Sequence, residues 1–312
     1  MPLLSAKPYA TSIDLEAPAL LAATGSLLAV TIIISRLAAD HAAPMLWFLT
    51  IVLGGAGLLL FLLAAYSGAV RGAWRPLALY GLGAGAFQAL PSAMAYLSVA
   101  HVGAGYVSLA FAFPLLITYA LALMFGMERF VGLRALGVAV ALAGGLLLAF
   151  GKFDGLDGAS GVGWVLVASG IPFIVAGGNL FRTRFWPSGA QPILLAALML
   201  LLAAALTAPF AVGLEGGTAW NRLAATPMLM LLTGLNIAAF ALQFIAYFRL
   251  QYVAGPVYLS QIGSVAAAVG TPVAVLLLGE TLPDGFALAL TLIVAGAVLF
   301  QVAGRKAGPR SS

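Results

Sequence analysis

The chain has 312 residues, of which 63% are hydrophobic and only 7% are charged, and its mean hydropathy is +1.12. A soluble domain carries about 25% charged residues, so this composition excludes an ordinary water-soluble protein. The absence of cysteine excludes disulfides and thiolate metal sites. The net charge of +5 comes from residues that stand singly between apolar runs, so we expect no nucleic-acid partner.

The first seventeen residues are polar and mixed in charge, and they lack the basic start and the cleavage site of a secretory signal. Beyond them, apolar runs long enough to cross a bilayer core of about 30 Å as helices recur ten times. The separators are short, so we expect no soluble domain. We predict transmembrane helices near residues 18–38, 44–66, 76–99, 104–125, 132–151, 161–181, 191–212, 227–248, 256–278 and 285–304.

The positions of lysine and arginine support this helix count and give an orientation. With the N-terminus inside, eleven of them fall on the cytoplasmic side and three on the outer side, as the positive-inside rule requires. A missed or extra helix would destroy this asymmetry. We therefore expect a multi-pass protein of the bacterial inner membrane with both termini in the cytoplasm. The cytoplasmic set is Lys7, Arg71, Arg75, Arg129, Arg134, Arg182, Arg184, Arg249, Arg305, Lys306 and Arg310, and the outer set is Arg36, Lys152 and Arg222.

The sequence contains an internal repeat with an offset of 152 residues. Each copy has five predicted helices, an odd number, so the second copy must enter the membrane inverted, as in many secondary transporters. The predicted all-helical fold is therefore two inverted five-helix repeats. They span residues 18–151 and 161–304, with an outer linker at 152–160 and cytoplasmic segments at 1–17 and 305–312. The matches include Tyr106-Val-Ser108 over Tyr258-Leu-Ser260, Glu128 over Glu280 and Ala143-Gly144 over Ala295-Gly296.

The segments Ala95 to Phe150 and Ala246 to Phe300 share one order of features. Each has a helix ending in small residues, a proline-bearing helix, a glycine and glutamate in the following loop, and a glycine-rich last helix. In this order and duplication, the chain resembles the EamA-type repeats of the drug/metabolite transporter superfamily, and within it the bacterial amino-acid exporters. The resemblance implies ten helices, a central cavity lined mainly by the first, third, fourth, sixth, eighth and ninth, and export from the cytoplasm.

Small residues and prolines inside the predicted spans indicate how the helices pack. The patterns Gly81-x-x-x-Gly85 and Gly137-x-x-x-Ala141 predict close contact between neighbouring helix backbones. Each proline removes a helix hydrogen bond and predicts a kink that could serve as a hinge. The prolines concerned are Pro91, Pro114, Pro172 and Pro272.

The charged residues indicate how transport is driven. All nine carboxylates lie outside the apolar cores, whereas proton-coupled carriers hold an ionisable group at membrane depth. We therefore expect facilitative transport, with no metal and no cofactor. Arg36, Arg182 and Arg184 lie near predicted helix ends, where snorkelling would carry their charges to the membrane surface. A proton relay or metal pair formed by His41 and His101 is disfavoured, because the two are far apart in sequence and lack supporting ligands.

Uncharged polar and aromatic side chains inside the spans form the candidate substrate site. On the helix predicted at 227–248, Asn236, Gln243 and Tyr247 share one face, and an amide that faced lipid would leave its donors unsatisfied. Hydrogen bonding between helices is the alternative explanation. We favour a cavity lining, which would suit an aromatic zwitterion. The candidate residues are Tyr80, Phe87, Gln88, Trp164, Asn179, Asn236, Gln243, Tyr247, Tyr258 and Gln261.

These features predict an exporter of small metabolites, chiefly amino acids with aromatic or large neutral side chains, that works by alternating access. Its expected partners are that substrate and the lipid bilayer. The chain has no Walker A pattern, no His-Glu-x-x-His and no nucleophile elbow, so we do not expect an enzyme. Two alternatives stay open. One is a multidrug or cationic-compound exporter, which we would expect to carry a buried carboxylate, and the other is a channel.

Overall fold

The computed structural model describes residues 16–70, 74–126, 130–153, 159–279 and 285–306. The predicted segments 1–17 and 305–312, the linker 152–160, and the loop residues Glu128 and Glu280 lie wholly or largely outside this part. Every regular element within it is a helix. The helices are α1 (Glu16–Asp40), α2 (Met45–Tyr66), α3 (Trp74–Val102), α4 (Ala104–Ala110), α5 (Pro114–Met124), α6 (Gly132–Phe153), α7 (Ala159–Arg184), α8 (Pro192–Glu215), α9 (Asn221–Ala225), α10 (Pro227–Leu259), α11 (Ile262–Leu278) and α12 (Phe286–Lys306).

Long apolar helices dominate the chain. Six helical stretches are long and apolar enough to cross a membrane, and three shorter apolar helices accompany them. Large apolar side chains also face outwards, among them Leu62, which is 58% exposed, and Leu276, which is 81% exposed. Water would disfavour a surface of this kind. The all-helical prediction is confirmed for the described residues, and the long apolar helices are compatible with a multi-pass membrane protein. The count of ten transmembrane helices stays a prediction. The six stretches are Glu16–Asp40, Met45–Tyr66, Ala104–Met124, Gly161–Arg184, Pro192–Glu215 and Pro227–Leu259.

The helix boundaries differ from the predicted ones around the centre of each half. The predicted helix 104–125 is broken into α4 and α5 at residues 111–113, and Pro114 lies in the first turn of α5 rather than inside a helix. Proline suits that position, because the missing N–H would have no helical partner there. In the second half, α10 continues to Leu259, and α11 begins only at Ile262. The short helix α9 lies in a segment predicted to be a loop.

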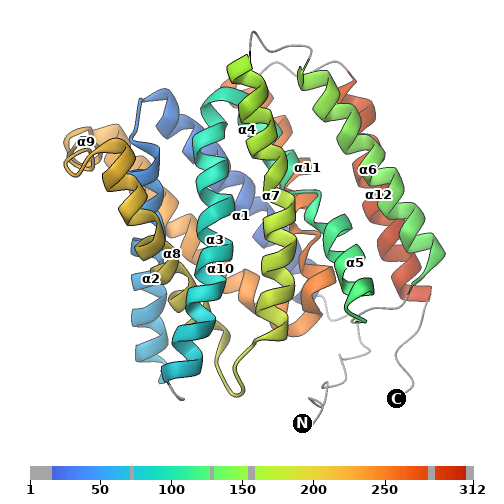
Figure 1. Ribbon diagram of the computed structural model, residues 1–312, viewed down its shortest axis with the longest axis horizontal. Helices are drawn as coiled ribbons and strands as arrows, with labels where there is room; N and C mark the ends of the chain where they lie inside the picture. Colours follow the sequence, from blue (N-terminus) through green and yellow to red (C-terminus); the bar gives the residue numbers. More distant parts are fainter. Residues whose placement is uncertain (1–15, 71–73, 127–129, 154–158, 280–284, 307–312) are drawn as a thin grey trace.

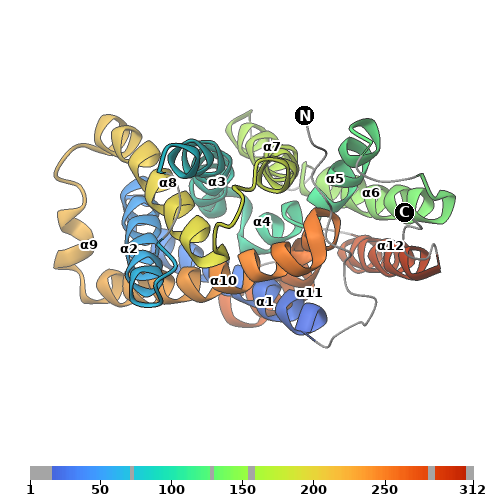
Figure 2. The ribbon, with the colours of Figure 1, turned by 90° about the horizontal axis from the view of Figure 1, so that it is seen from below.

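The helices are arranged with two end groups around a centre. α2, α3 and α8 pack together at one end, α6 packs along α12 at the other, and α1, α4, α7, α10 and α11 lie between them (Figures 1 and 2). A Cβ atom on Gly81 would lie 2.9 Å from Leu202 Cδ1, and one on Gly85 would lie 3.0 Å from the backbone nitrogen of Ala203, both on α8. The predicted close packing at these glycines is confirmed.

The contact between α6 and α12 relates the two copies of the sequence repeat. A Cβ atom on Gly137 would lie 2.7 Å from the carbonyl oxygen of Gly296, and one on Gly144 would lie 2.6 Å from that of Ala289. Residue 289 is 137 plus 152, and residue 296 is 144 plus 152. The same contact therefore recurs with the partners exchanged, which is the pattern expected across a two-fold axis.

Two glycines with unusual backbone conformations follow the same offset of 152 residues. Gly103 has φ 87° and ψ 157°, and Gly255 has φ 76° and ψ 179°. Glycine adopts such positive φ values without the clash that a Cβ atom would cause. Each residue ends a long helical stretch and begins a short one, formed by α4 in the first half and by residues 256–259 in the second. The two breaks therefore lie at equivalent positions of the two sequence copies.

Glu215, at the end of α8, caps the start of α2. Its Oε1 accepts a hydrogen bond from the backbone N–H of Leu46 at 2.9 Å, and its Oε2 accepts one from that of Trp47 at 3.0 Å. The N-cap residue of α2 is Pro44, which makes no side-chain cap. Glu215 therefore satisfies two N–H groups that have no partner within the helix, and its charge lies at the positive end of the helix dipole.

Replacing Glu215 by alanine is expected to destabilise the protein by about 1–2 kcal/mol, because both capping bonds are lost. Thermal unfolding in detergent, followed by circular dichroism, measures the effect. Glu16→Ala is the control, since Glu16 forms a half-exposed ion pair with Arg249 at 2.7 Å, a type of pair that contributes little. Equal unfolding midpoints for the two variants would contradict the capping role.

Candidate functional site

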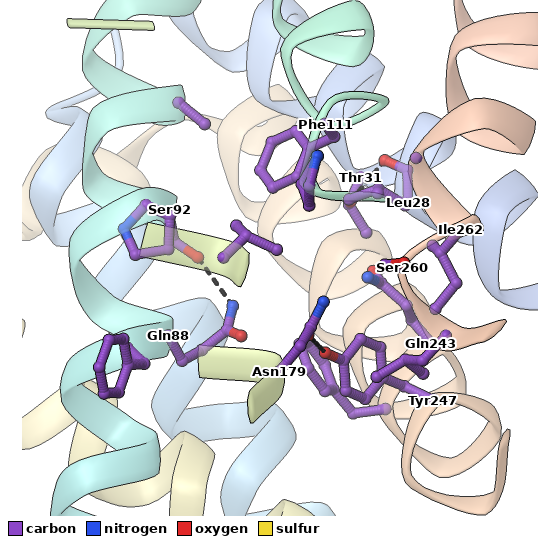
Figure 3. Close-up of a pocket in the computed structure, with 18 of the residues that line it drawn as sticks. Leu28, Thr31, Gln88, Ser92, Phe111, Asn179, Gln243, Tyr247, Ser260 and Ile262 are labelled. Atoms are coloured by element: carbon purple, nitrogen blue, oxygen red, sulfur yellow. Dashed lines mark hydrogen bonds between the residues drawn. The ribbon is translucent and has the colours of Figure 1, made fainter. Parts of the chain in front are cut away.

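A cavity lies at the centre of the molecule, between helices of the two halves of the chain (Figure 3). The first half contributes side chains from α1 and α3 and the turn between α4 and α5. The second half contributes side chains from α7, α10 and α11. Apolar wall residues include Leu28, Phe87, Phe240 and Phe244. The polar wall residues are Thr31, Gln88, Ser92, Tyr96, Asn179, Arg182, Gln243, Tyr247 and Ser260.

The polar residues from α3 and α10 differ in how fully their hydrogen bonds are satisfied. Gln88 Nε2 donates to Ser92 Oγ at 2.8 Å, one turn further along α3. Gln243 is only 4% exposed, and its Oε1 has no hydrogen-bond partner in the described part of the protein. A buried amide oxygen without a donor is unfavourable. Gln243 therefore offers a free acceptor in the cavity wall.

Arg182 is the centre of a polar cluster in the wall. Its Nη2 donates to Asn179 Oδ1 at 2.8 Å and also to the hydroxyl of Tyr247. The Tyr247 hydroxyl donates in turn to Asn179 Oδ1 at 2.7 Å (Figure 3). The guanidinium carbon lies 5.2 Å from the centroid of the Tyr247 ring, a cation–π distance. Asn179 and Tyr247 therefore fix the guanidinium against one side of the cavity.

The burial of Arg182 corrects the expectation that its charge snorkels to the membrane surface. The residue is only 2% exposed, whereas Arg184, two positions later, is exposed. The reason lies in the helix period. Arg182 follows Asn179 by three residues and shares its inward face, while Arg184 is turned about 200° from Arg182. That spacing could have identified Arg182 from the sequence, but its place near a helix end suggested a surface position.

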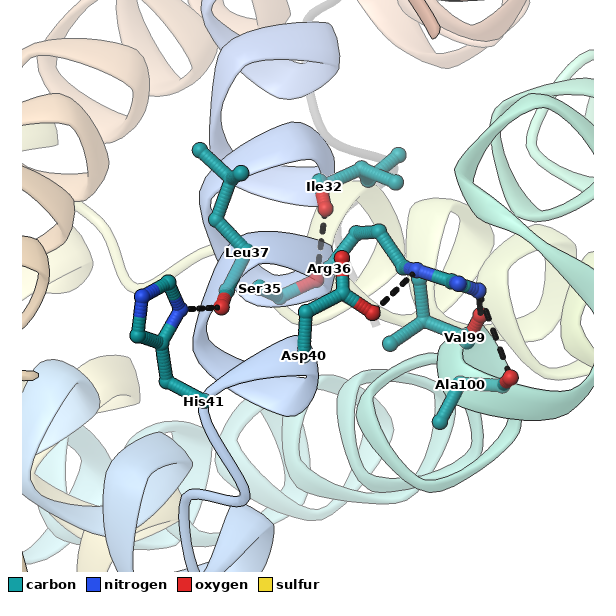
Figure 4. A network of polar contacts seen from close by, with 8 residues as sticks. All are labelled: Ile32, Ser35, Arg36, Leu37, Asp40, His41, Val99 and Ala100. Carbon is teal, nitrogen blue, oxygen red and sulfur yellow. Dashed lines mark hydrogen bonds and ion pairs between the residues drawn. The ribbon is translucent and has the colours of Figure 1, made fainter. Parts of the chain in front are cut away.

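No carboxylate among the described residues neutralises Arg182. Glu16 pairs with Arg249, and Glu215 caps α2. Asp40 pairs with Arg36 at 2.9 Å, and Arg36 also donates to the carbonyl oxygens of Val99 and Ala100 at the end of α3 (Figure 4). Within the described ranges, no group of acidic or histidine side chains could hold a metal ion. The cavity wall is thus positively charged at Arg182.

The structure brings together five of the ten predicted site residues. They come from three helices: two from α3, one from α7 and two from α10. On α10, Gln243 and Tyr247 line the cavity from the one face that the helical period predicted, whereas Asn236 of the same face does not. The five residues in the cavity wall are Phe87, Gln88, Asn179, Gln243 and Tyr247.

The other five predicted residues do not line the cavity. Asn236 is fully buried, and its Nδ2 donates to the hydroxyl of Tyr96 at 2.8 Å, so it joins two helices, as the alternative explanation held. Trp164 stacks on His101 with ring centroids 4.5 Å apart. Tyr258 and Gln261 lie beside the break between α10 and α11.

Tyr80 belongs to an aromatic cluster next to the cavity. Its ring centroid lies 6.2 Å from that of Phe181 and 6.4 Å from that of Trp186. Trp186 also packs on Phe248 and Tyr252, at 5.9 Å from each. These contacts tie Trp186 to the helices around the cavity. Phe181 links the cluster to the cavity through Phe87, at 5.5 Å.

Sequence reasoning missed several wall residues besides Arg182. Ser92, Tyr96 and Ser260 are all buried and line the cavity. Ser92 lies four residues after Gln88, so the helical period could have placed it on the same face. Ser260 lines the cavity at the break between α10 and α11. The spacing of polar residues around Ser260 in the sequence does not predict that break.

Comparison with known proteins adds information on the fold. No family model and no curated protein matches the chain. The chain is similar to a solved structure described as "Crystal structure of protein", with a TM-score of 0.65 and 20% sequence identity. The likeness covers 93% of this chain and 98% of the other. This protein therefore shares its fold with that solved structure over nearly its whole length. At 20% identity the similarity supports a shared fold alone.

Proposed function

We propose that this protein is a transmembrane carrier that exports small metabolites, chiefly amino acids with aromatic or large neutral side chains, from the bacterial cytoplasm by alternating access. The observation that carries the proposal is the central cavity, whose wall combines aromatic rings, amides and one guanidinium from both halves of the chain. Binding pockets for small molecules have this composition, mostly apolar with a few polar groups that orient the ligand.

The proposed architecture is a pair of inverted five-helix repeats with ten transmembrane helices and both termini in the cytoplasm. Three features that follow the offset of 152 residues support it. The first two are the glycine breaks at Gly103 and Gly255 and the exchanged contacts of α6 and α12. The third is the close approach of Gly263 to the backbone of Phe111, because residue 263 is 111 plus 152. Transporters with inverted repeats bind substrate where the two repeats meet. The cavity, with walls from both halves, fits this plan.

The buried guanidinium weighs against the proposed alternative of a cationic-compound exporter. A cation in the cavity would be repelled by Arg182, and no carboxylate of the described chain lines the wall to attract it. The lack of an acidic group in the described wall also supports facilitative rather than proton-coupled transport.

Transport by the purified protein in liposomes tests the proposal. Liposomes preloaded with unlabelled phenylalanine should accumulate labelled phenylalanine by counterflow, and uptake should saturate with concentration. Liposomes without protein are the control. A flux that stays linear in concentration and shows no counterflow would indicate a channel. Acceleration by a pH gradient would overturn the facilitative mechanism, and uptake of organic cations but not amino acids would overturn the proposed substrate class.

A further inference from the structure

Arg182 carries a buried positive charge with no negative partner among the described residues, and this requires an explanation. Taking a charge out of water is costly unless the charge is paired and hydrogen-bonded. Arg182 is 2% exposed, and its described polar partners are the neutral side chains of Asn179 and Tyr247, with Met199 Sδ at 3.9 Å from its Nη1. Its Nε is buried without a hydrogen-bond partner in the described structure. The guanidinium lines the cavity, so an anion in the cavity could supply the missing charge.

We propose that Arg182 binds the carboxylate of the transported substrate, so that a free carboxylate is obligatory in the cargo. This inference rests on the proposed carrier function and narrows its substrate class. A guanidinium is planar and presents several N–H donors, which suits it to a carboxylate. Asn179 and Tyr247 orient the guanidinium through Nη2, and the substrate completes its coordination.

A second buried group in the same wall matches the other end of an amino acid. Gln243 Oε1 is a buried acceptor without a described donor, and Gln243 lies one helical turn from Tyr247 on the same face of α10. An ammonium group carries three donors and no acceptor. The wall therefore offers a cation for the carboxylate and an oxygen for the ammonium. Phe240 and Phe244 lie beside Gln243 and give an apolar side chain a surface to pack on.

The unmodified protein provides the first test, which needs no variant. Unlabelled competitors of labelled phenylalanine counterflow are compared: phenylalanine, 3-phenylpropanoate, which lacks the amino group, and phenethylamine, which lacks the carboxylate. For half-maximal inhibition of the counterflow, phenethylamine should require a concentration about 10- to 100-fold higher than phenylalanine. This factor corresponds to the loss of one hydrogen bond between charged groups. 3-Phenylpropanoate should still compete. Competition by phenethylamine equal to that of phenylalanine would overturn the role of Arg182 and leave the carrier function standing.

Two substitutions test the residue itself. Arg182→Gln should weaken phenylalanine uptake by about 10- to 100-fold. Asn179→Asp places a carboxylate where Oδ1 now accepts from Nη2 at 2.8 Å, so it should keep the fold and lose transport, because the internal anion displaces that of the substrate. Arg249→Gln is the matched control, since Arg249 is half-exposed and pairs with Glu16 outside the cavity. Normal transport by Asn179→Asp would contradict the proposal.

A binding measurement separates the proposed carboxylate site at Arg182 from the proposed carrier function. If the protein in liposomes transports no amino acid, the carrier function is overturned, while the carboxylate site is still testable by binding. Thermal unfolding in detergent is then measured with and without 3-phenylpropanoate. A rise of the unfolding midpoint in the wild type but not in Arg182→Gln supports the carboxylate site. Equal midpoints with and without the acid in the wild type would overturn it.

Discussion

Replacing Gly263 by alanine is expected to keep the chain from reaching its folded state. The added Cβ atom would lie 1.4 Å from the carbonyl oxygen of Phe111 and 2.1 Å from its carbonyl carbon. Both are backbone atoms in the break between α4 and α5, so no change of side-chain rotamer relieves the overlap. We expect a loss of at least about 4 kcal/mol, at the upper end of single-residue effects. The yield of monodisperse protein after size-exclusion chromatography in detergent measures it.

Gly234→Ala is the matched control for this substitution. Gly234 lies inside α10, and a Cβ atom there would meet no heavy atom within 4 Å. Alanine within a helix should be neutral or more stable by about 0.5–1 kcal/mol. Comparable yields of the Gly263 and Gly234 variants would show that the backbones of α11 and of residues 111–113 do not touch in this way.

Replacing Asn179 by leucine is expected to produce the second large effect. Asn179 Oδ1 accepts hydrogen bonds from both Arg182 and Tyr247, and leucine offers no acceptor. Loss of a hydrogen bond to a buried charged group typically costs about 1.5–3 kcal/mol, because the guanidinium then loses an acceptor that no water replaces. The unfolding midpoint in detergent should fall accordingly.

The double variant Asn179→Leu with Arg182→Met is the control for this effect. Removing the charge together with its acceptor should restore part of the lost stability, since no buried charge then lacks a partner. If the double variant is as unstable as the sum of the two single variants, the hydrogen bond between Asn179 and Arg182 does not carry the effect.

The sequence by itself determined the class of protein and the local packing of its helices. The composition and the apolar runs determined a helical membrane protein, because backbone in lipid must satisfy its own hydrogen bonds. The glycine spacings determined where helices pack closely, as at Gly81 and Gly85. Along α10, the helical period put Gln243 and Tyr247 on one face, and both line the cavity. Such properties depend only on residues near one another in the chain.

Only the tertiary structure decided which polar side chains share the cavity. Asn236 and Gln243 lie on the same face of α10. Asn236 is fully buried and donates a hydrogen bond to Tyr96 on α3, whereas Gln243 lines the cavity. The break at residues 111–113 and the inward turn of Arg182 were likewise decided by packing. The physical reason is that periodicity states which way a side chain points on its helix, whereas its burial and its partners depend on which other helix lies there.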